Sequence, residues 1–226
     1  WVLRRRFADI PVTRHDIMTM GAGGLLMEIS SRPLPRAFAS PKDPTALPED
    51  RHESGTTKIA AIVLAAGQSR RMGDINKLLV KVDGTAMVAR AVDAALASGA
   101  DPVIVVTGHE RERIEQVLAG RAAEILHNPD FAEGMSTSVR AGLNALPADS
   151  AAALICLGDM PHVDAALISR LIEGFDPARG HAICVPTYKG KRGNPVLWAA
   201  RYFPAMKNLS GDVGARHLIG EHSDAV

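Results

Sequence analysis

Two glycines, two arginines and a lysine directly follow the most apolar stretch of the chain, in the segment GQSRRMGDINK after IAAIVLAA. Glycines let backbone N–H groups approach a polyphosphate closely, Arg71 can span two of its oxygens, and Lys77 supplies a compact positive charge. A Walker A loop or a dinucleotide fingerprint would need a different glycine and lysine spacing. The segment therefore predicts a phosphate-binding loop of another type, with an exposed basic turn as the alternative. Its expected contacts come from Gly67, Ser69, Arg71, Gly73 and Lys77.

Two aspartates stand where they could hold a divalent cation for such a loop. CLGDMP ends an apolar run with Asp159, and LSGDVGAR places Asp212 between two glycines. Because Mg²⁺ keeps several of its waters, it needs only one or two protein carboxylates. We therefore expect Asp159 and Asp212 to be Mg²⁺ ligands. The alternative at each position is a helix cap, and at Asp212 it competes almost evenly.

Two further polar segments could contact substrates. EGMSTSVRAG places Ser136 and Ser138 at the start of an expected helix, where their donors could reach a base or ribose. Ordinary capping would explain one serine but not both. KGKRGNPV carries Lys189, Lys191 and Arg192 on a glycine-broken loop. This loop is either a solvated hairpin tip or part of a lid over an anionic second substrate.

Several function classes are disfavoured. Lysine plus arginine number 26 and aspartate plus glutamate 25, so a net charge of +1 gives no field of the kind that nucleic-acid binders carry. The segment HERER ends in Arg113 where a zinc protease motif would need histidine, and no Gly-x-Ser-x-Gly elbow occurs. We therefore expect neither nucleic acid as a partner nor covalent hydrolase chemistry.

Strands and helices are expected to alternate along most of the chain. This alternation predicts an α/β fold with three layers, Rossmann-like, with a mostly parallel sheet whose ligands lie beyond the carboxyl ends of its strands. The expected strands are 59–66, 102–108, 123–128, 151–159, 182–188 and 194–199. The expected helices are 85–98, 110–118, 136–146, 163–175 and 212–219.

The composition predicts three parts of unequal size: residues 1–30 as the remnant of an upstream domain, a proline-rich linker at 31–57, and a catalytic domain at 58–226. The first residue is not methionine, and we expect the chain to be a piece of a longer protein. Cys156 and Cys184 lie in apolar runs, which favours buried reduced thiols and a cytoplasmic protein. No apolar run reaches the roughly 20 residues of a membrane helix, so no membrane contact is expected.

Five motifs together resemble the molybdenum cofactor cytidylyltransferase family: LAAGQSRRMGDINKLL, NPDFAEGMSTSVRAGL, CLGDMP, RGNPVLW and LSGDVGAR. The resemblance covers residues 59–219 and implies the nucleotidyltransferase version of the three-layer fold. It also implies that CMP passes from CTP to the terminal phosphate of a molybdopterin-type cofactor, with release of pyrophosphate. The product of that family serves molybdenum hydroxylases such as xanthine dehydrogenase, so a molybdenum hydroxylase apo-enzyme is a further expected partner. The upstream residues 11–36 resemble the end of a molybdopterin-binding domain, which also points to molybdenum.

Site residues follow from the same resemblance. The nucleotide loop falls on 64–73, the magnesium aspartate on Asp159, and Arg192 and Asn194 are expected to bind the second substrate. Lys77 and Arg71 would stabilise the leaving pyrophosphate, while Mg²⁺ on Asp159 and Asp212 would bridge the reacting phosphates. The expected nucleotide-binding residues are Leu64, Ala65, Ala66, Gly67, Ser69, Arg71, Gly73, Lys77, Ser136 and Ser138.

The choice of nucleotide depends on Ala66. Members of the guanylyl branch tend to have Leu-Ala-Gly-Gly where this chain has Leu-Ala-Ala-Gly, and a methyl at Ala66 would narrow the base pocket in favour of CTP. Such a methyl discriminates by only about 1–3 kcal/mol. The alternatives are guanylyl or other nucleotidyl transfer to molybdopterin or a sugar phosphate, and a non-catalytic cofactor-binding chaperone for a molybdoenzyme.

Overall fold

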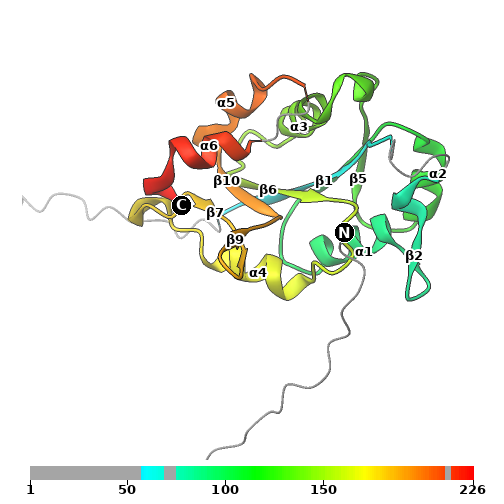
Figure 1. Ribbon diagram of the computed structural model, residues 1–226, viewed down its shortest axis with the longest axis horizontal. Coiled ribbons are helices and arrows are strands. Elements are labelled where there is room, and N and C mark those ends of the chain that lie inside the picture. The colour runs from blue at the N-terminus through cyan, green and yellow to red at the C-terminus, as the bar shows by residue number, and fades with distance from the viewer. Residues whose placement is uncertain (1–56, 69–74, 212–214) are drawn as a thin grey trace, which may run out of the picture. The chain divides into compact units, whose positions relative to one another are not determined.

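A six-stranded sheet lies between two layers of helices (Figure 1), in a computed structural model that describes residues 57–68, 75–211 and 215–226. The strand order is β5-β4-β1-β6-β10-β7. The strands are β1 (Ile59–Ala65), β4 (Val103–Thr107), β5 (Glu124–His127), β6 (Ala152–Leu157), β7 (Ile183–Cys184) and β10 (Val196–Ala199). All pairings among the first four are parallel, whereas β10 is antiparallel to both β6 and β7. The predicted fold class, with a mostly parallel sheet, is confirmed.

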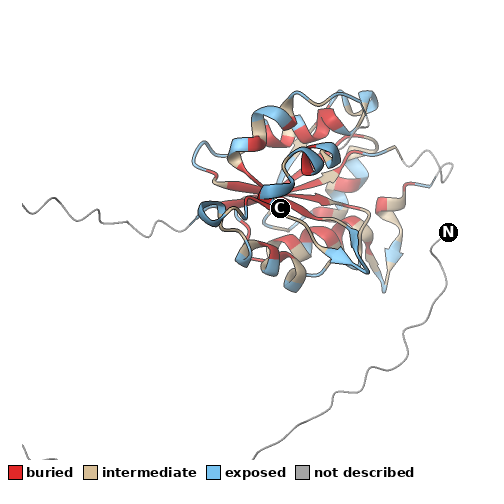
Figure 2. Cartoon of the chain, turned by 60° about the vertical axis from the view of Figure 1, so that its left-hand side comes forward, coloured by how far each residue is buried: buried red, intermediate tan, exposed pale blue. Residues whose placement is uncertain are grey.

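Strand β1 occupies the centre of the sheet because both of its faces are apolar. Ile62 points to one core together with Ile104 and Val106, and Val63 points to the other together with Val105. A strand covered on both faces needs a continuous apolar run rather than an alternating one. Figure 2 shows the strands as the most buried layer of the chain.

Each face of the sheet carries its own set of helices. One core includes side chains of α1 (Met87–Leu96), α2 (Arg111–Leu118) and α4 (Ala165–Glu173). The other includes side chains of α3 (Met135–Asn144), α5 (Phe203–Lys207) and α6 (Arg216–Glu221). Single turns of 3-10 helix also occur: η2 (Lys77–Leu79), η3 (Phe131–Glu133), η4 (Pro177–Arg179), η5 (Ala200–Tyr202) and η6 (Ser223–Ala225).

Two short hairpins modify the expected elements. The helix expected from residue 85 begins at Met87, because β2 (Lys81–Val82) and β3 (Thr85–Ala86) pair around a turn in which Asp83 and Gly84 have positive φ. Asp-Gly between two short strands is a strong hairpin signal and explains why the helix begins later than expected. The strand expected at 182–188 is divided into β7 and β8 (Thr187–Tyr188), which pairs with β9 (Lys191–Arg192). The lysine-rich loop is therefore a hairpin tip.

The two cysteines are free thiols. Cys156 lies on β6 in the core, and burial raises the pKa of its thiol to about 12. Burial also raises the pKa of the less buried Cys184. Within the part of the chain that the structure describes, no helix is both long and apolar enough to cross a membrane. The boundaries predicted within residues 1–57 concern a part of the chain almost wholly outside the described residues and stay predictions.

Gly142 gives a direct test of how α3 packs on β1. A Cβ at this position would lie 2.5 Å from Cγ2 of Ile62, a buried β-branched side chain with little rotamer freedom. We expect Gly142→Ala to lower the free energy of unfolding by about 1–3 kcal/mol, measured by chemical denaturation.

Gly220→Ala is the matched control, because Gly220 is also helical and a Cβ there meets nothing within 4 Å. Alanine should stabilise that helix or leave it unchanged. Equal effects of the two substitutions would contradict the close packing of α3 on β1.

Candidate functional site

Three loops meet at the carboxyl edge of the sheet, beyond the ends of β1, β4 and β6. Gly158, after β6, donates its N–H to the carbonyl of Leu64 at 3.0 Å. His109, after β4, donates its N–H to the carbonyl of Ala66 at 3.3 Å. Both neighbouring loops are therefore hydrogen-bonded to the end of β1, the place where an open α/β sheet usually binds its ligands.

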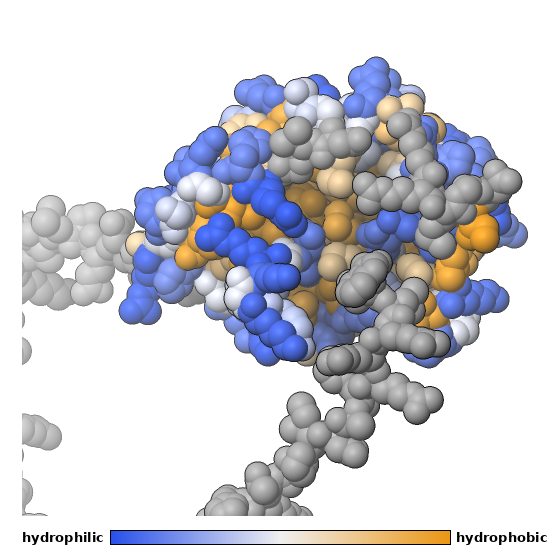
Figure 3. Space-filling model, in the orientation of Figure 1, coloured by the Kyte–Doolittle hydropathy of each residue, from blue (hydrophilic) through white to orange (hydrophobic). Residues whose placement is uncertain are grey.

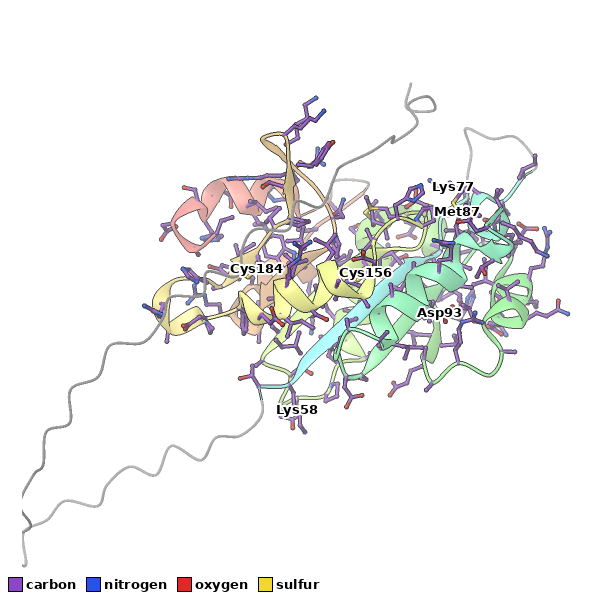
Figure 4. All side chains as sticks on the ribbon, turned by 90° about the horizontal axis from the view of Figure 1, so that it is seen from below. Lys58, Lys77, Met87, Asp93, Cys156 and Cys184 are labelled. Carbon is purple, nitrogen blue, oxygen red and sulfur yellow. The ribbon has the colours of Figure 1, made fainter. Side chains whose placement is uncertain are left out.

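Lys77 and Asp159 contact each other at this edge. The Lys77 Nζ donates to Asp159 Oδ2 in an ion pair between η2 and the turn after β6. The two side chains remain 38% and 31% exposed, so a ligand can still reach both. Figure 4 shows Lys77 near one end of β1, with Lys58 near the other. The lysine of the predicted phosphate-binding loop and the predicted magnesium aspartate are thus brought together, and their roles in binding stay predictions.

Asn76 fixes the turn that carries Lys77. Its Oδ1 accepts a hydrogen bond from the Leu78 N–H at 3.1 Å, and the residue is only 5% exposed. Leu78 anchors the other side of the turn in the core. The Arg113 guanidinium lowers the pKa of the Glu110 carboxyl, and the nearby Asn76 amide adds to this effect, although its Nδ2 has no hydrogen bond of good geometry to a described residue.

Gly158 allows the turn with Asp159 to approach β1. A Cβ at Gly158 would lie 3.0 Å from the Leu64 carbonyl oxygen and 3.2 Å from Leu78 Cδ2, which is tighter than side chains normally tolerate. Arg90, on α1, holds the far side of the same turn by donating from Nε to the Pro161 carbonyl at 3.2 Å. The turn that carries Asp159 is therefore held on both sides, by the backbone hydrogen bond from Gly158 to Leu64 and by the Arg90 side chain.

The start of α3 is a buried polar cluster. Asn128 donates from Nδ2 to Thr137 Oγ1 at 2.9 Å and to Ser138 Oγ at 3.0 Å. Ser136 is also buried, and its hydroxyl has no hydrogen-bond partner among the described residues, although its N–H donates to the Gly211 carbonyl at 3.1 Å. Of the two predicted serines, Ser138 is thus engaged within the protein while Ser136 keeps an uncommitted hydroxyl. Nucleotide contact by either stays a prediction.

A pocket of about 660 Å³ lies on the β6 and β10 side of the edge. Because β10 is antiparallel, the loop before it lies at the carboxyl end of β6, and this brings Arg192 and Asn194 into the pocket lining. Arg216 and His217 of α6 join them. The rest of the lining is largely apolar: Met135, Val139, Ile155, Leu157, Val196, Trp198, Met206 and Ile219. Figure 3 shows apolar surface between hydrophilic side chains in this region.

The predicted site residues lie partly within and partly outside the described part of the chain. Ser69, Arg71, Gly73 and Asp212 lie outside the described residues. Of the others, Leu64 and Ala65 end β1, Ala66 is buried, and Gly67 is exposed with open space around its Cα.

The donor set fits a magnesium ion that relies mainly on waters and phosphates. Among residues 57–68, 75–211 and 215–226, no group of three metal-binding side chains occurs. Asp159 offers one partly exposed carboxylate beside Lys77. One or two carboxylates suffice for Mg²⁺ when phosphates complete the coordination.

Three residues that matter to this geometry were missed at the level of sequence. Asn76 had a readable signal, since asparagine before a short helix is a good cap. Arg90 and Arg216 had no such signal in the sequence. Arg90 donates to a backbone carbonyl that is distant in sequence, and Arg216 lines a pocket formed by elements that are not consecutive.

Asn76→Ala tests how the Lys77 turn is held. Removal of the side-chain oxygen leaves the Leu78 N–H without its partner, and a buried unsatisfied donor costs about 1–3 kcal/mol. We expect that loss in the free energy of unfolding from a urea titration.

Asn144→Ala, at the exposed end of α3, is the control and should change stability by no more than about 0.5 kcal/mol. An unchanged midpoint for Asn76→Ala would show that the cap does not stabilise the turn.

Comparisons with known proteins agree with this fold. The family described as the MobA-like NTP transferase domain matches residues 61–226. The bifunctional protein GlmU of Sorangium cellulosum is 33% identical over 176 residues, which are 75% of this chain but 35% of that protein. The chain thus spans about a third of the length of that relative.

Two shorter relatives match over most of their own length. The nicotine blue oxidoreductase of Paenarthrobacter nicotinovorans and the purine catabolism protein PucB of Bacillus subtilis are each 28% identical over 71% of this chain. The matches cover 81% and 80% of those proteins.

Among solved structures, Rv0371c of Mycobacterium tuberculosis has a TM-score of 0.64 and 28% identity, covering 73% of this chain and 82% of that one. Its complex with manganese has a TM-score of 0.63, with 26% identity, covering 73% of this chain and 83% of that one.

Proposed function

The chain belongs to the MobA-like NTP transferase family, and from that premise we propose that it transfers CMP from CTP to the terminal phosphate of molybdopterin cofactor and releases pyrophosphate. The observation that carries the proposal is the contact of Lys77 with Asp159 beside the end of β1. A cation and a carboxylate at one point suit a reaction between two phosphates: the cation binds oxygens of the nucleotide, and the carboxylate can hold a metal.

The chemistry requires positioning more than proton transfer. The attacking phosphate is already ionised at neutral pH, so no side chain has to activate it. The protein has to bring two anions into line and neutralise the charge that develops on the α-phosphate and on the departing pyrophosphate. In this proposal the backbone after β1 holds the triphosphate, and Lys77, with Arg71, stabilises the leaving side.

Asp159, with Asp212, would hold Mg²⁺. When bound, Mg²⁺ supplies Lewis-acid neutralisation of phosphate oxygens. The manganese complex of Rv0371c supports the use of a divalent ion by a protein of this fold. Asp159 is well placed for it, because Gly158 and Arg90 fix its turn while the carboxylate stays accessible.

The pocket beside β10 is the proposed acceptor site. Its apolar floor suits the faces of a flat heterocycle, and Arg192 and Arg216 on its rim suit a phosphate. A cofactor bound here would reach the Asp159 turn along β6. A molybdenum hydroxylase is the proposed recipient of the product, and one relative is named a purine catabolism protein.

A substrate panel tests the proposal. Purified protein with Mg²⁺ would be given CTP, GTP, ATP or UTP, each with molybdopterin or with a sugar phosphate, and pyrophosphate release would be measured. We expect release with CTP and molybdopterin. Preference for GTP or for a sugar phosphate would support another transfer reaction, and binding of cofactor without any release would support a chaperone.

Lys77→Ala should lower turnover by roughly 100-fold or more without unfolding the protein, because a preorganised charge is lost where negative charge develops. Steady-state pyrophosphate release measures turnover, and circular dichroism checks the fold. Lys81→Ala removes a nearby exposed lysine and should keep normal turnover. If the two variants were equally active, Lys77 would have no part in the reaction.

Arg192→Ala should raise KM for the acceptor roughly tenfold while KM for CTP stays the same, since a charge-assisted hydrogen bond is worth about 1.5–3 kcal/mol. Lys191→Ala is the matched control, because Lys191 is exposed on the same hairpin but does not line the pocket. A rise in KM for CTP instead would move Arg192 to the nucleotide side.

A further inference from the structure

The β4 side of the edge carries an aromatic wall formed by His109 and Phe131. The acceptor pocket lies on the other side, against β6 and β10, and the Lys77–Asp159 contact lies between β1 and β6. If the triphosphate occupies the end of β1, its nucleoside has to extend away from the acceptor, toward β4. His109 lies two residues after the end of β4, and Phe131 begins η3.

Gly108 and Ala66 pack beneath this wall without spare room. A Cβ on Gly108 would lie 2.6 Å from Phe131 Cβ, 2.7 Å from Phe131 Cγ and 2.8 Å from Ala66 Cβ. Phe131 therefore lies directly over Gly108, and the Ala66 methyl also lies against Gly108. The ring cannot retreat toward the sheet.

The outer part of the wall remains accessible. The rings of His109 and Phe131 lie 6.2 Å apart at 45°. The His109 side chain is 42% exposed and Phe131 is half-buried, so neither is a pure core residue. An exposed aromatic surface beside a phosphate-binding loop is suited to stacking a base, because every base has a π-face.

We propose that Phe131, supported by His109, stacks the base of the nucleotide and, because its ring is packed against Gly108 and cannot move toward the sheet, sets base specificity in favour of a pyrimidine. The proposal rests on the nucleotidyl transfer proposed above and adds to it the identity of the discriminating side chain. Ala66 is only 5% exposed, and its methyl and Phe131 both face Gly108, so in this proposal the methyl acts on the base through Phe131.

Equilibrium binding of CTP and GTP to single variants tests this role. Phe131→Ala should weaken CTP binding roughly tenfold or more, in line with the loss of one base–aromatic stack. It should also bring the Kd for CTP closer to the Kd for GTP, so that the preference for CTP is reduced. Phe131→Leu keeps apolar bulk for folding but removes the ring, and should likewise lose CTP affinity. The ratio of the two Kd values is independent of the fraction of folded protein, because both nucleotides are titrated into one sample.

A double variant tests the coupling to Ala66. In the wild-type protein, Ala66→Gly should bring the Kd values for CTP and GTP closer together. In a protein that already carries Phe131→Ala, the same substitution should have little further effect, because both residues contribute to the same wall. Tyr188→Ala is the control, as Tyr188 is an exposed aromatic residue on the β8–β9 hairpin, and it should leave both Kd values unchanged.

The outcomes separate this inference from the function on which it rests. Unchanged Kd values and an unchanged ratio in Phe131→Ala, in a protein that still transfers CMP, would overturn the inference alone. A wild-type protein that binds no nucleotide and releases no pyrophosphate would remove the proposed function, and the inference with it.

Discussion

The hydrogen bond from Gly158 to the Leu64 carbonyl is the contact on which the site depends. It joins the end of β6 to the end of β1 one residue before Asp159. A side chain at Gly158 would push this turn away from both the β1 backbone and the Leu78 side chain beneath Lys77. The close approach of the two backbones therefore fixes where the turn that carries Asp159 lies relative to the end of β1 and to Leu78.

The sheet could be predicted from sequence because its strands are short apolar runs covered on both faces, as at Ile62 and Val63. The meeting of Lys77 and Asp159 could also be expected, since the carboxyl ends of parallel strands share one edge. The strand order could not be predicted, because the sequence of a buried strand does not show which strand it will pair with. For the same reason the positions of Arg216 and Phe131 near this edge could not be predicted. Each comes close to it only through the packing of elements that are distant in sequence.

Polar residues at the start of α3 show a second limit. Serines before an apolar helix are typical both of caps and of ligand contacts, and the sequence cannot distinguish the two. The fold distinguishes them in part, because the side-chain amide of Asn128 donates hydrogen bonds to the hydroxyls of Thr137 and Ser138. The hydroxyl of Ser136, without such a partner among the described residues, keeps its capacity to bind.

The reversed direction of β10 has a consequence for how such a protein can change. The loop that precedes an antiparallel strand, not the one that follows it, reaches the ligand edge, and here that loop includes the β8–β9 hairpin. A hairpin tip can be lengthened or exchanged without altering the register of any central strand. Specificity for the acceptor can therefore change during evolution while the residues at the nucleotide side of the edge stay the same.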